Sequence, residues 1–314
     1  MIVNLFLFLG FLFILIKSAD FSINYSYKLA KSLSLSEFII SFFIVTIISI
    51  LPETIISIFS SLRGMPEFGV GTLIGSNIAD LTLVFGIIAL VSVKGVKIKS
   101  EILKENYWYL GLLFLPVLFG LDGFYSIFDG LLLILFGLLF FITLSIDYKK
   151  SYNKKIKKDK TELIKNFILL ILSLAILLIS ASYTIKSAIN FANDVKIPPI
   201  LISLTIISVG TCLPELLFST KAVKDNHDSL ALGDLLGTVI TDSTIILGIV
   251  IILNPFYVNY SLVYITCISM FLSGVLCILF INSGKILTKK EAVYLLLFYI
   301  IYLIIEFIVK TKLM

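Results

Sequence analysis

The sequence has few of the side chains from which most catalytic and metal sites of soluble proteins are built. Histidine occurs once, as His227 in a polar loop, which excludes a histidine-based metal site or catalytic triad. The three cysteines form no CxxC pair and are odd in number, so they predict neither a redox motif nor a disulfide framework. Charged residues make up only 14% of the chain, whereas about 25% is usual in soluble domains.

Apolar residues are abundant instead, at 59% of 314 positions. A soluble core of this size could not bury so much apolar surface, but a lipid bilayer can accommodate it. The apolar stretch 1–16 lacks the basic segment of a signal peptide and has no small-residue cleavage site before Lys17. It therefore predicts a retained helix. The composition therefore predicts an all-α polytopic protein whose main partner is the bilayer, with no nucleic acid bound.

Apolar stretches long enough for the roughly 30 Å hydrocarbon layer predict ten transmembrane helices. They lie near 2–31, 36–62, 69–93, 105–119, 123–146, 164–191, 197–221, 229–253, 260–282 and 290–309. If the N-terminus faces outward, 19 of the 25 basic residues fall on the inner side, as the positive-inside rule requires. We therefore expect a multi-pass protein of the cell membrane with both termini outside and the basic linker 147–163 in the cytoplasm.

The two halves of the chain repeat each other. Residues 50–86 align without a gap on 212–248, and every matched position is 162 residues apart. This predicts a first five-helix repeat over 1–146 and a second over 164–314. Because each repeat has an odd number of spans, the second must enter the membrane from the opposite side, which predicts inverted repeats. Pro52 and Pro214 predict breaks in the second and seventh helices.

Four carboxylates lie near the middle of predicted spans, namely Glu53, Asp80, Glu215 and Asp242. A centred acid costs roughly 2.5–3.5 kcal/mol on insertion scales, and no basic residue lies at comparable depth. Oxygen ligands without histidine or a thiolate pair suit hard cations such as Ca²⁺, Mg²⁺ or Na⁺. The acids therefore predict a midplane cation site, and the two glutamates could clamp one divalent ion between the repeats.

Several neighbouring polar residues have more than one interpretation. The hydroxyls of Ser76 and Thr238 could contact an ion or bond to a carbonyl of their own helix. Asp228 and Asp234 stand near the predicted start of the eighth helix, where an acid favours the helix N-terminus. We expect both aspartates to act as helix-capping residues.

The motif GTCLPE at 210–215, followed by GDLLGTVITD at 233–242, resembles the calcium/cation antiporter superfamily, notably sodium/calcium exchangers. IGSNIAD at 74–80 is similar to the second motif in the first repeat. The resemblance implies Ca²⁺ exchange by a ten-helix fold, with Glu53 and Glu215 as the central Ca²⁺ ligands. It also implies that Asp80 and Asp242 flank them. The hydroxyls that match Na⁺ ligands are those of Ser49, Thr211, Ser76 and Thr238.

The chain departs from this pattern at a few positions. Ile48 replaces the motif glycine, and Ile50 and Cys212 occupy positions where a hydroxyl is usual. Asp80 stands where asparagine is often found. The loss of two hard oxygens weakens the expectation of Na⁺ binding, while an added carboxylate favours H⁺.

We therefore predict a secondary transporter, not an enzyme, that exchanges Ca²⁺ for Na⁺ or H⁺ and uses no cofactor. The alternatives are a cation channel, or an exchanger of another divalent ion such as Mg²⁺ or Mn²⁺. A channel filter is usually shared around an oligomer axis, whereas this site lies in one chain, so we expect a monomer to suffice. An intramembrane aspartyl hydrolase is a third class, but two equivalent Glu–Asp pairs exceed what one acid–base dyad needs.

Overall fold

The structure is a computed structural model whose regular elements are almost all helical. It describes residues 2–33, 35–64, 66–92, 94–97, 106–151, 160–194, 210, 212–258, 262–284 and 286–313. Thr211, the loop 98–105 and most of the predicted seventh span therefore lie outside the described residues.

The elements of the first half include two short π-helical segments, labelled η. They are α1 (Ile2–Leu33), α2 (Glu37–Ile40), η1 (Ser41–Val45), α3 (Thr46–Ser49), α4 (Leu51–Leu62), α5 (Pro66–Ala79), η2 (Asp80–Val84), α6 (Phe85–Val91), β1 (Val96–Lys97), α7 (Asn106–Gly120), β2 (Phe124–Tyr125) and α8 (Ile127–Ser151). Those of the second half are α9 (Lys160–Asp194), α12 (Leu213–Lys224), α13 (Asp228–Ile240), η5 (Thr241–Ile246), α14 (Leu247–Leu253), β3 (Phe256–Tyr257), η6 (Leu262–Cys267), α15 (Ile268–Gly284), β4 (Ile286–Leu287) and α16 (Lys289–Leu313).

The chain is a multi-pass membrane protein with several apolar helices. Within the described residues, seven helices are long and apolar enough to cross a membrane, or eight if the bent pair 37–49 and 51–62 counts as one span. Two predicted spans account for the difference from ten. The helix α7 is short, with its apolar part at Trp108–Gly120, and the span expected at 197–221 is described only from residue 210. The ten-helix inverted arrangement therefore stays a prediction.

The repeat seen in the sequence is also present in the bounds of the helices. The helices α4 and α12 begin at Leu51 and Leu213, which are 162 residues apart, and both have 12 residues. The same offset relates α8 to α16, from Ile127 to Lys289, and both have 25 residues. The repeat thus extends well beyond the motif region, because matched sequences form helices of matched length.

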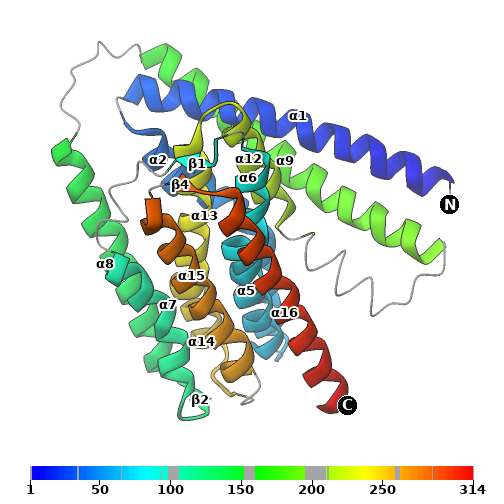
Figure 1. The fold of residues 1–314 in the computed structure, drawn as a ribbon, viewed down its shortest axis with the longest axis vertical. Helices are drawn as coiled ribbons and strands as arrows, with labels where there is room; N and C mark the ends of the chain where they lie inside the picture. The colour runs from blue at the N-terminus through cyan, green and yellow to red at the C-terminus, as the bar shows by residue number, and fades with distance from the viewer. Residues whose placement is uncertain are drawn as a thin grey trace. The chain divides into compact units, whose positions relative to one another are not determined.

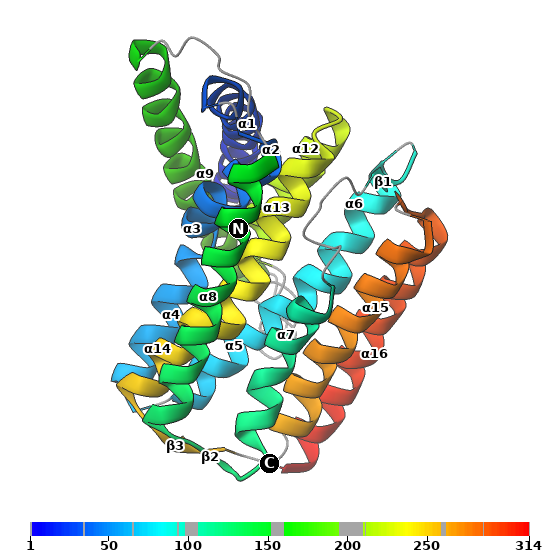
Figure 2. The same ribbon diagram turned by 90° about the vertical axis from the view of Figure 1, so that its left-hand side faces the viewer.

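The described chain divides into two compact units, and each combines segments from both sequence halves. The first unit comprises residues 1–49 and 154–235. Its long helices α1 and α9 pack along each other, as Figures 1 and 2 show. Since these two helices occupy matching positions in the halves, the unit joins equivalent elements. The division into repeats at 1–146 and 164–314 describes sequence symmetry and stays a prediction as a domain division.

The second unit comprises residues 50–153 and 236–314, and it contains pairs of equivalent contacts between the halves. A Cβ on Gly248 of α14 would lie 2.6 Å from the carbonyl oxygen of Gly130 in α8, so the two backbones touch. The equivalent positions make the same contact, since Gly86 of α6 lies against the carbonyl of Ala292 in α16. Gly86 matches Gly248, and Ala292 matches Gly130. These close approaches pack α8 on α14 and α16 on α6.

Two short antiparallel strand pairs also join the two halves of the sequence. The strand β1 pairs with β4, and β2 pairs with β3. The strands β2 and β4 are 162 residues apart, so each ribbon joins one strand from each half. In Figure 2 the β2–β3 ribbon closes one end of α8 and α14. Within this unit, each strand of one half pairs with the non-equivalent strand of the other half. A two-fold relation between the halves produces such pairs.

The close backbone contact at Gly248 gives a first testable prediction. The substitution Gly248→Ala places a methyl group against a carbonyl oxygen that cannot move independently of α8, and we expect a loss of about 2 kcal/mol in stability. The matched control is Gly75→Ala, since a Cβ at Gly75 of α5 would meet nothing within 4 Å. It removes a helical glycine and should stabilise the protein by up to about 1 kcal/mol. Thermal unfolding in detergent measures both, and equal melting temperatures would contradict the assigned contact.

Candidate functional site

The two motif glutamates occupy the first turns of α4 and α12. Each is 1% exposed and follows a proline at the second position of its helix. Glu53 lies in the second unit and Glu215 in the first. An acid in the first turn interacts favourably with the positive end of the helix dipole, which helps a buried carboxylate to remain charged. The sequence thus places equivalent anionic groups at two helix starts.

The backbone at these helix starts is the same in both halves. The amide of Thr54 donates to the carbonyl of Ile50 at 3.0 Å, and the amide of Leu216 donates to Cys212 at 2.9 Å. In the first half, α3 ends at Ser49 and α4 begins at Leu51, so the interruption predicted from Pro52 is present. The residues that precede the two helices, Ile50 and Cys212, are both buried and make no side-chain capping bond.

The two motif aspartates mark the π-helical segments. Asp80 is the first residue of η2 and Asp242 the second of η5, and both are buried. A threonine hydroxyl in each segment donates to the carbonyl four residues earlier, Thr82 to Ile78 and Thr244 to Ile240, each at 2.5 Å. Hydroxyls that capture such carbonyls compete with the backbone ladder, and π-segments often occur at functional sites.

Within the second unit these aspartates lie on either side of a contact between equivalent residues. The side-chain amide of Asn77 donates to the carbonyl of Val239 at 3.4 Å, and these positions are 162 residues apart. Equivalent residues can touch only where the relating axis passes between them. Asp80 and Asp242 each follow by three residues, and the charges of Asp80 and Glu53 both act on Asp242. In this unit Asp242 is therefore within electrostatic range of both Glu53 and Asp80.

Acidic side chains alone do not form a closed metal site. Across the described ranges, no group of three or more His, Cys, Asp or Glu side chains is placed to hold a metal ion together. A cation bound near these acids can also use hydroxyl or carbonyl oxygens, as hard cations commonly do. The assignment of Glu53, Asp80, Glu215 and Asp242 as ligands stays a prediction.

The predicted hydroxyl ligands have different surroundings. Ser76 donates to the carbonyl of Leu73 at 2.9 Å, which is the local bond considered as its alternative role. Thr238 is fully buried, and its hydroxyl has no hydrogen-bond partner among the residues that the structure describes. Ser49 lies 3.0 Å from a carboxylate oxygen of Asp234 and 3.2 Å from the carbonyl of Thr46.

The capping role expected for Asp234 is wrong. The helix α13 begins at Asp228, which does lie in its first turn, but Asp234 is the seventh residue and is fully buried. A signal for this was present in the sequence. Asp234, Thr238 and Asp242 are spaced by four residues, which places them on one helix face. The repeat was a second sign that Asp234 is not an ordinary capping residue, since the matching position in the first half is the uncharged Thr72.

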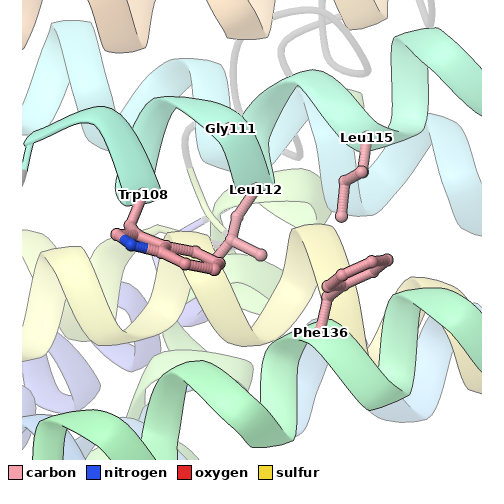
Figure 3. A pocket seen from close by; sticks show the side chains of 5 residues that line it. All are labelled: Trp108, Gly111, Leu112, Leu115 and Phe136. Carbon is pink, nitrogen blue, oxygen red and sulfur yellow. The ribbon is translucent and has the colours of Figure 1, made fainter.

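A separate pocket in the second unit contains none of the predicted ligands. It has a volume of about 290 Å³ and is lined by Trp108, Gly111, Leu112, Leu115 and Phe136. Figure 3 shows the Trp108 ring on α7 and the Phe136 ring on α8 at its wall. The lining is apolar, so this pocket is unsuited to a small cation.

Comparisons with known proteins agree with the repeat and with the motifs. The family model described as sodium/calcium exchanger protein matches residues 3–146 and 165–308, again offset by 162. The sodium/calcium exchanger MaX1 of Methanosarcina acetivorans is 29% identical and covers 96% of this chain and 98% of its own. The putative antiporter CaxA of Alkalimonas amylolytica is 31% identical over 81% of this chain and 82% of its own.

Solved structures agree as well. A structure of the sodium-calcium exchanger NCX_Mj superposes with a TM-score of 0.83 at 25% sequence identity, covering 96% of this chain and 97% of that one. The likeness extends over almost the whole fold, not only over the motif region.

Proposed function

Because the chain belongs to the sodium/calcium exchanger protein family, we propose that it is a secondary antiporter that moves Ca²⁺ across the cell membrane in exchange for Na⁺ or H⁺. The family consists of transporters rather than enzymes. The observation that carries the proposal is the pair of buried glutamates, Glu53 and Glu215, at equivalent helix starts in the two matched repeats. Buried carboxylates in a membrane protein are costly, and those that occur usually mark an ion or proton pathway.

In the proposed mechanism, Glu53 and Glu215 supply the negative charge for one Ca²⁺ ion, and Asp80 and Asp242 flank them. The hydroxyls of Ser49, Thr211, Ser76 and Thr238 belong to the same candidate ligand set. Inverted repeats place such sites at the midplane, and alternating access exposes them to one side at a time. The proposal includes the predicted topology, with both termini outside and the linker 147–163 in the cytoplasm. A monomer suffices, since every candidate ligand comes from one chain.

The counter-ion depends on a few positions where the chain departs from its family. Ile50 and Cys212 remove two hard oxygen donors at equivalent places, and a thiol is a poor ligand for Na⁺. Asp80 adds a carboxylate, and crowded carboxylates compete for protons. We therefore expect weakened Na⁺ coupling and Ca²⁺ transport that is at least partly driven by a pH gradient.

This prediction is tested by Ca²⁺ uptake into proteoliposomes under a Na⁺ gradient alone and a pH gradient alone, with the membrane potential clamped. We expect the pH gradient alone to drive uptake, and the Na⁺ gradient to be the weaker driving force. Uptake driven by Na⁺ alone, with no response to the pH gradient, would contradict the argument from Ile50, Cys212 and Asp80.

Two alternatives give different outcomes in the same vesicles. An exchanger of Mg²⁺ or Mn²⁺ would transport that ion in preference to Ca²⁺, since the oxygen ligand set suits several hard divalent cations. A cation channel would conduct Ca²⁺ down its gradient whatever counter-ion is present.

A further inference from the structure

Asp234 is a buried carboxylate of the first unit that the repeat symmetry does not explain. It is 0% exposed, and its equivalent in the first half is Thr72. One carboxylate oxygen accepts a hydrogen bond from the Ser49 hydroxyl at 3.0 Å. The other, Oδ2, is buried and has no hydrogen-bond partner among the described residues. An ionised carboxylate in this state is strongly unfavourable unless a cation or a proton neutralises it.

The surrounding backbone holds this carboxylate in place. A Cβ on the preceding Gly233 would lie 2.5 Å from the carbonyl oxygen of Phe38, so α13 is in direct backbone contact with the α2–η1 segment. The hydroxyl of Thr46 donates to the backbone carbonyl of Asp234 at 3.2 Å. Asp234 and Ser49 are therefore fixed against each other by packing and by hydrogen bonds within one compact unit.

The Ser49 hydroxyl has two acceptors for its single hydrogen, the Asp234 carboxylate at 3.0 Å and the Thr46 carbonyl at 3.2 Å. A hydroxyl has one hydrogen to donate and two lone pairs to offer. When Ser49 donates its hydrogen to Asp234, both lone pairs of its oxygen remain available. The Oδ2 atom of Asp234 adds a negatively charged donor beside it. Together they provide hard oxygens and a single negative charge, and this matches a monovalent ion better than Ca²⁺, which takes six to eight oxygens and several carboxylates.

We propose that Asp234 and Ser49 form a Na⁺-binding subsite, which the equivalent pair Thr72 and Thr211 cannot reproduce because it has no carboxylate. It deepens the proposed exchange function and rests on it, because it names where the Na⁺ that the chain can still bind is held. In the equivalent place of the other half, Thr72 supplies no charge.

The subsite also lies in line with the predicted pathway. Asp234 is four residues before Thr238 and eight before Asp242, so the three side chains follow one face of the same helix and its π continuation. The orientation predicted from the lysines places the start of α13 on the cytoplasmic side. A Na⁺ ion at Asp234 would thus be one helical turn on the cytoplasmic side of Thr238.

The test is equilibrium binding of ²²Na⁺ and, separately, of ⁴⁵Ca²⁺ to the purified full-length protein in detergent. Asp234→Asn keeps the size of the side chain and an oxygen for Ser49 but removes the charge. Asp234→Thr makes the two halves alike. We expect each variant to bind Na⁺ about tenfold more weakly, as loss of a charged partner in a buried hydrogen-bonded group implies. Ca²⁺ affinity should change by less than about twofold. Asp228→Asn, an acid in the first turn of the same helix, is the matched control and should bind both ions as the wild type does.

Three results would overturn the subsite. The first is unchanged Na⁺ affinity in both Asp234 variants. The second is an equal loss of Na⁺ and Ca²⁺ affinity, because this would indicate a merely structural role. The third is a wild-type protein that binds no Na⁺. The binding assay is independent of transport, so failure of the exchange function and failure of the subsite are distinguishable. A wild type that binds Na⁺ at Asp234 but does not exchange Ca²⁺ would contradict only the proposed function.

Discussion

Glu53→Gln and Glu215→Gln are each expected to reduce Ca²⁺ flux by about 100-fold or more. Glutamine keeps the size of the side chain and one carbonyl oxygen, but it removes a full negative charge from the candidate ion site. Two unit charges 4 Å apart interact by about 4 kcal/mol at an effective dielectric constant of 20, and every 1.4 kcal/mol is a factor of ten. Losing one of two central carboxylates is therefore enough to abolish measurable transport of a divalent ion.

The matched controls are acids in the first turns of other helices. Glu67 is the second residue of α5 and Glu162 the third of α9, and both are exposed. Glu67→Gln and Glu162→Gln should transport at near-normal rates. Size-exclusion profiles and melting temperatures of all four variants verify that they are folded. Near-normal Ca²⁺ flux in the Glu53 and Glu215 variants would remove the assignment of these residues as ligands.

Restoring the two absent hydroxyls is expected to have the opposite effect on Na⁺. Ile50→Ser and Cys212→Ser should each lower the Na⁺ concentration that gives half-maximal Ca²⁺ exchange by about tenfold, and by about 100-fold together, if each hydroxyl contributes roughly 1.4 kcal/mol. Both residues are buried where helices α4 and α12 begin, at 4% and 1% exposure. Each precedes the first turn that contains a motif glutamate, so a serine hydroxyl would be added three residues before Glu53 or Glu215.

Apolar substitutions at the same positions separate the oxygen from the change in volume. Ile50→Val and Cys212→Ala alter packing without adding a ligand, so they should leave the Na⁺ dependence unchanged. If the serine and apolar variants behave alike, the hydroxyl oxygens do not contribute to Na⁺ binding in this chain. The counter-ion argument would then lose its basis at these two positions.

The helices were largely predictable because their signals are local. Apolar runs of sufficient length predicted a span near 2–31, where α1 extends from Ile2 to Leu33, and one near 290–309, where α16 extends from Lys289 to Leu313. Pro52 predicted the interruption that separates α3 from α4, because proline lacks the amide hydrogen that a continuous helix needs. A span near 105–119 was also predicted, and α7 lies there with a shorter apolar part, Trp108–Gly120.

The contacts of Asp234 were not predictable in the same way. Its partner Ser49 is 185 residues away in sequence, so no local pattern indicates their hydrogen bond. Position near a helix start instead suggested a capping role. Only the four-residue spacing of Asp234, Thr238 and Asp242, together with the mismatch to Thr72, distinguished Asp234 from an ordinary first-turn acid. The π-segments at Asp80 and Asp242, with their threonine hydroxyls bonded to the carbonyls four residues earlier, were likewise not predicted.

The most direct test of the central claim is accumulation of Ca²⁺ against its own gradient. Purified protein in liposomes is given equal Ca²⁺ inside and outside, a clamped membrane potential, and an outward gradient of H⁺ and Na⁺. Coupled exchange through the carboxylate site predicts that internal Ca²⁺ rises above the external concentration, and that this rise is absent in Glu53→Gln and Glu215→Gln. Internal Ca²⁺ that never exceeds the external level, with wild type and variants alike, would contradict the account.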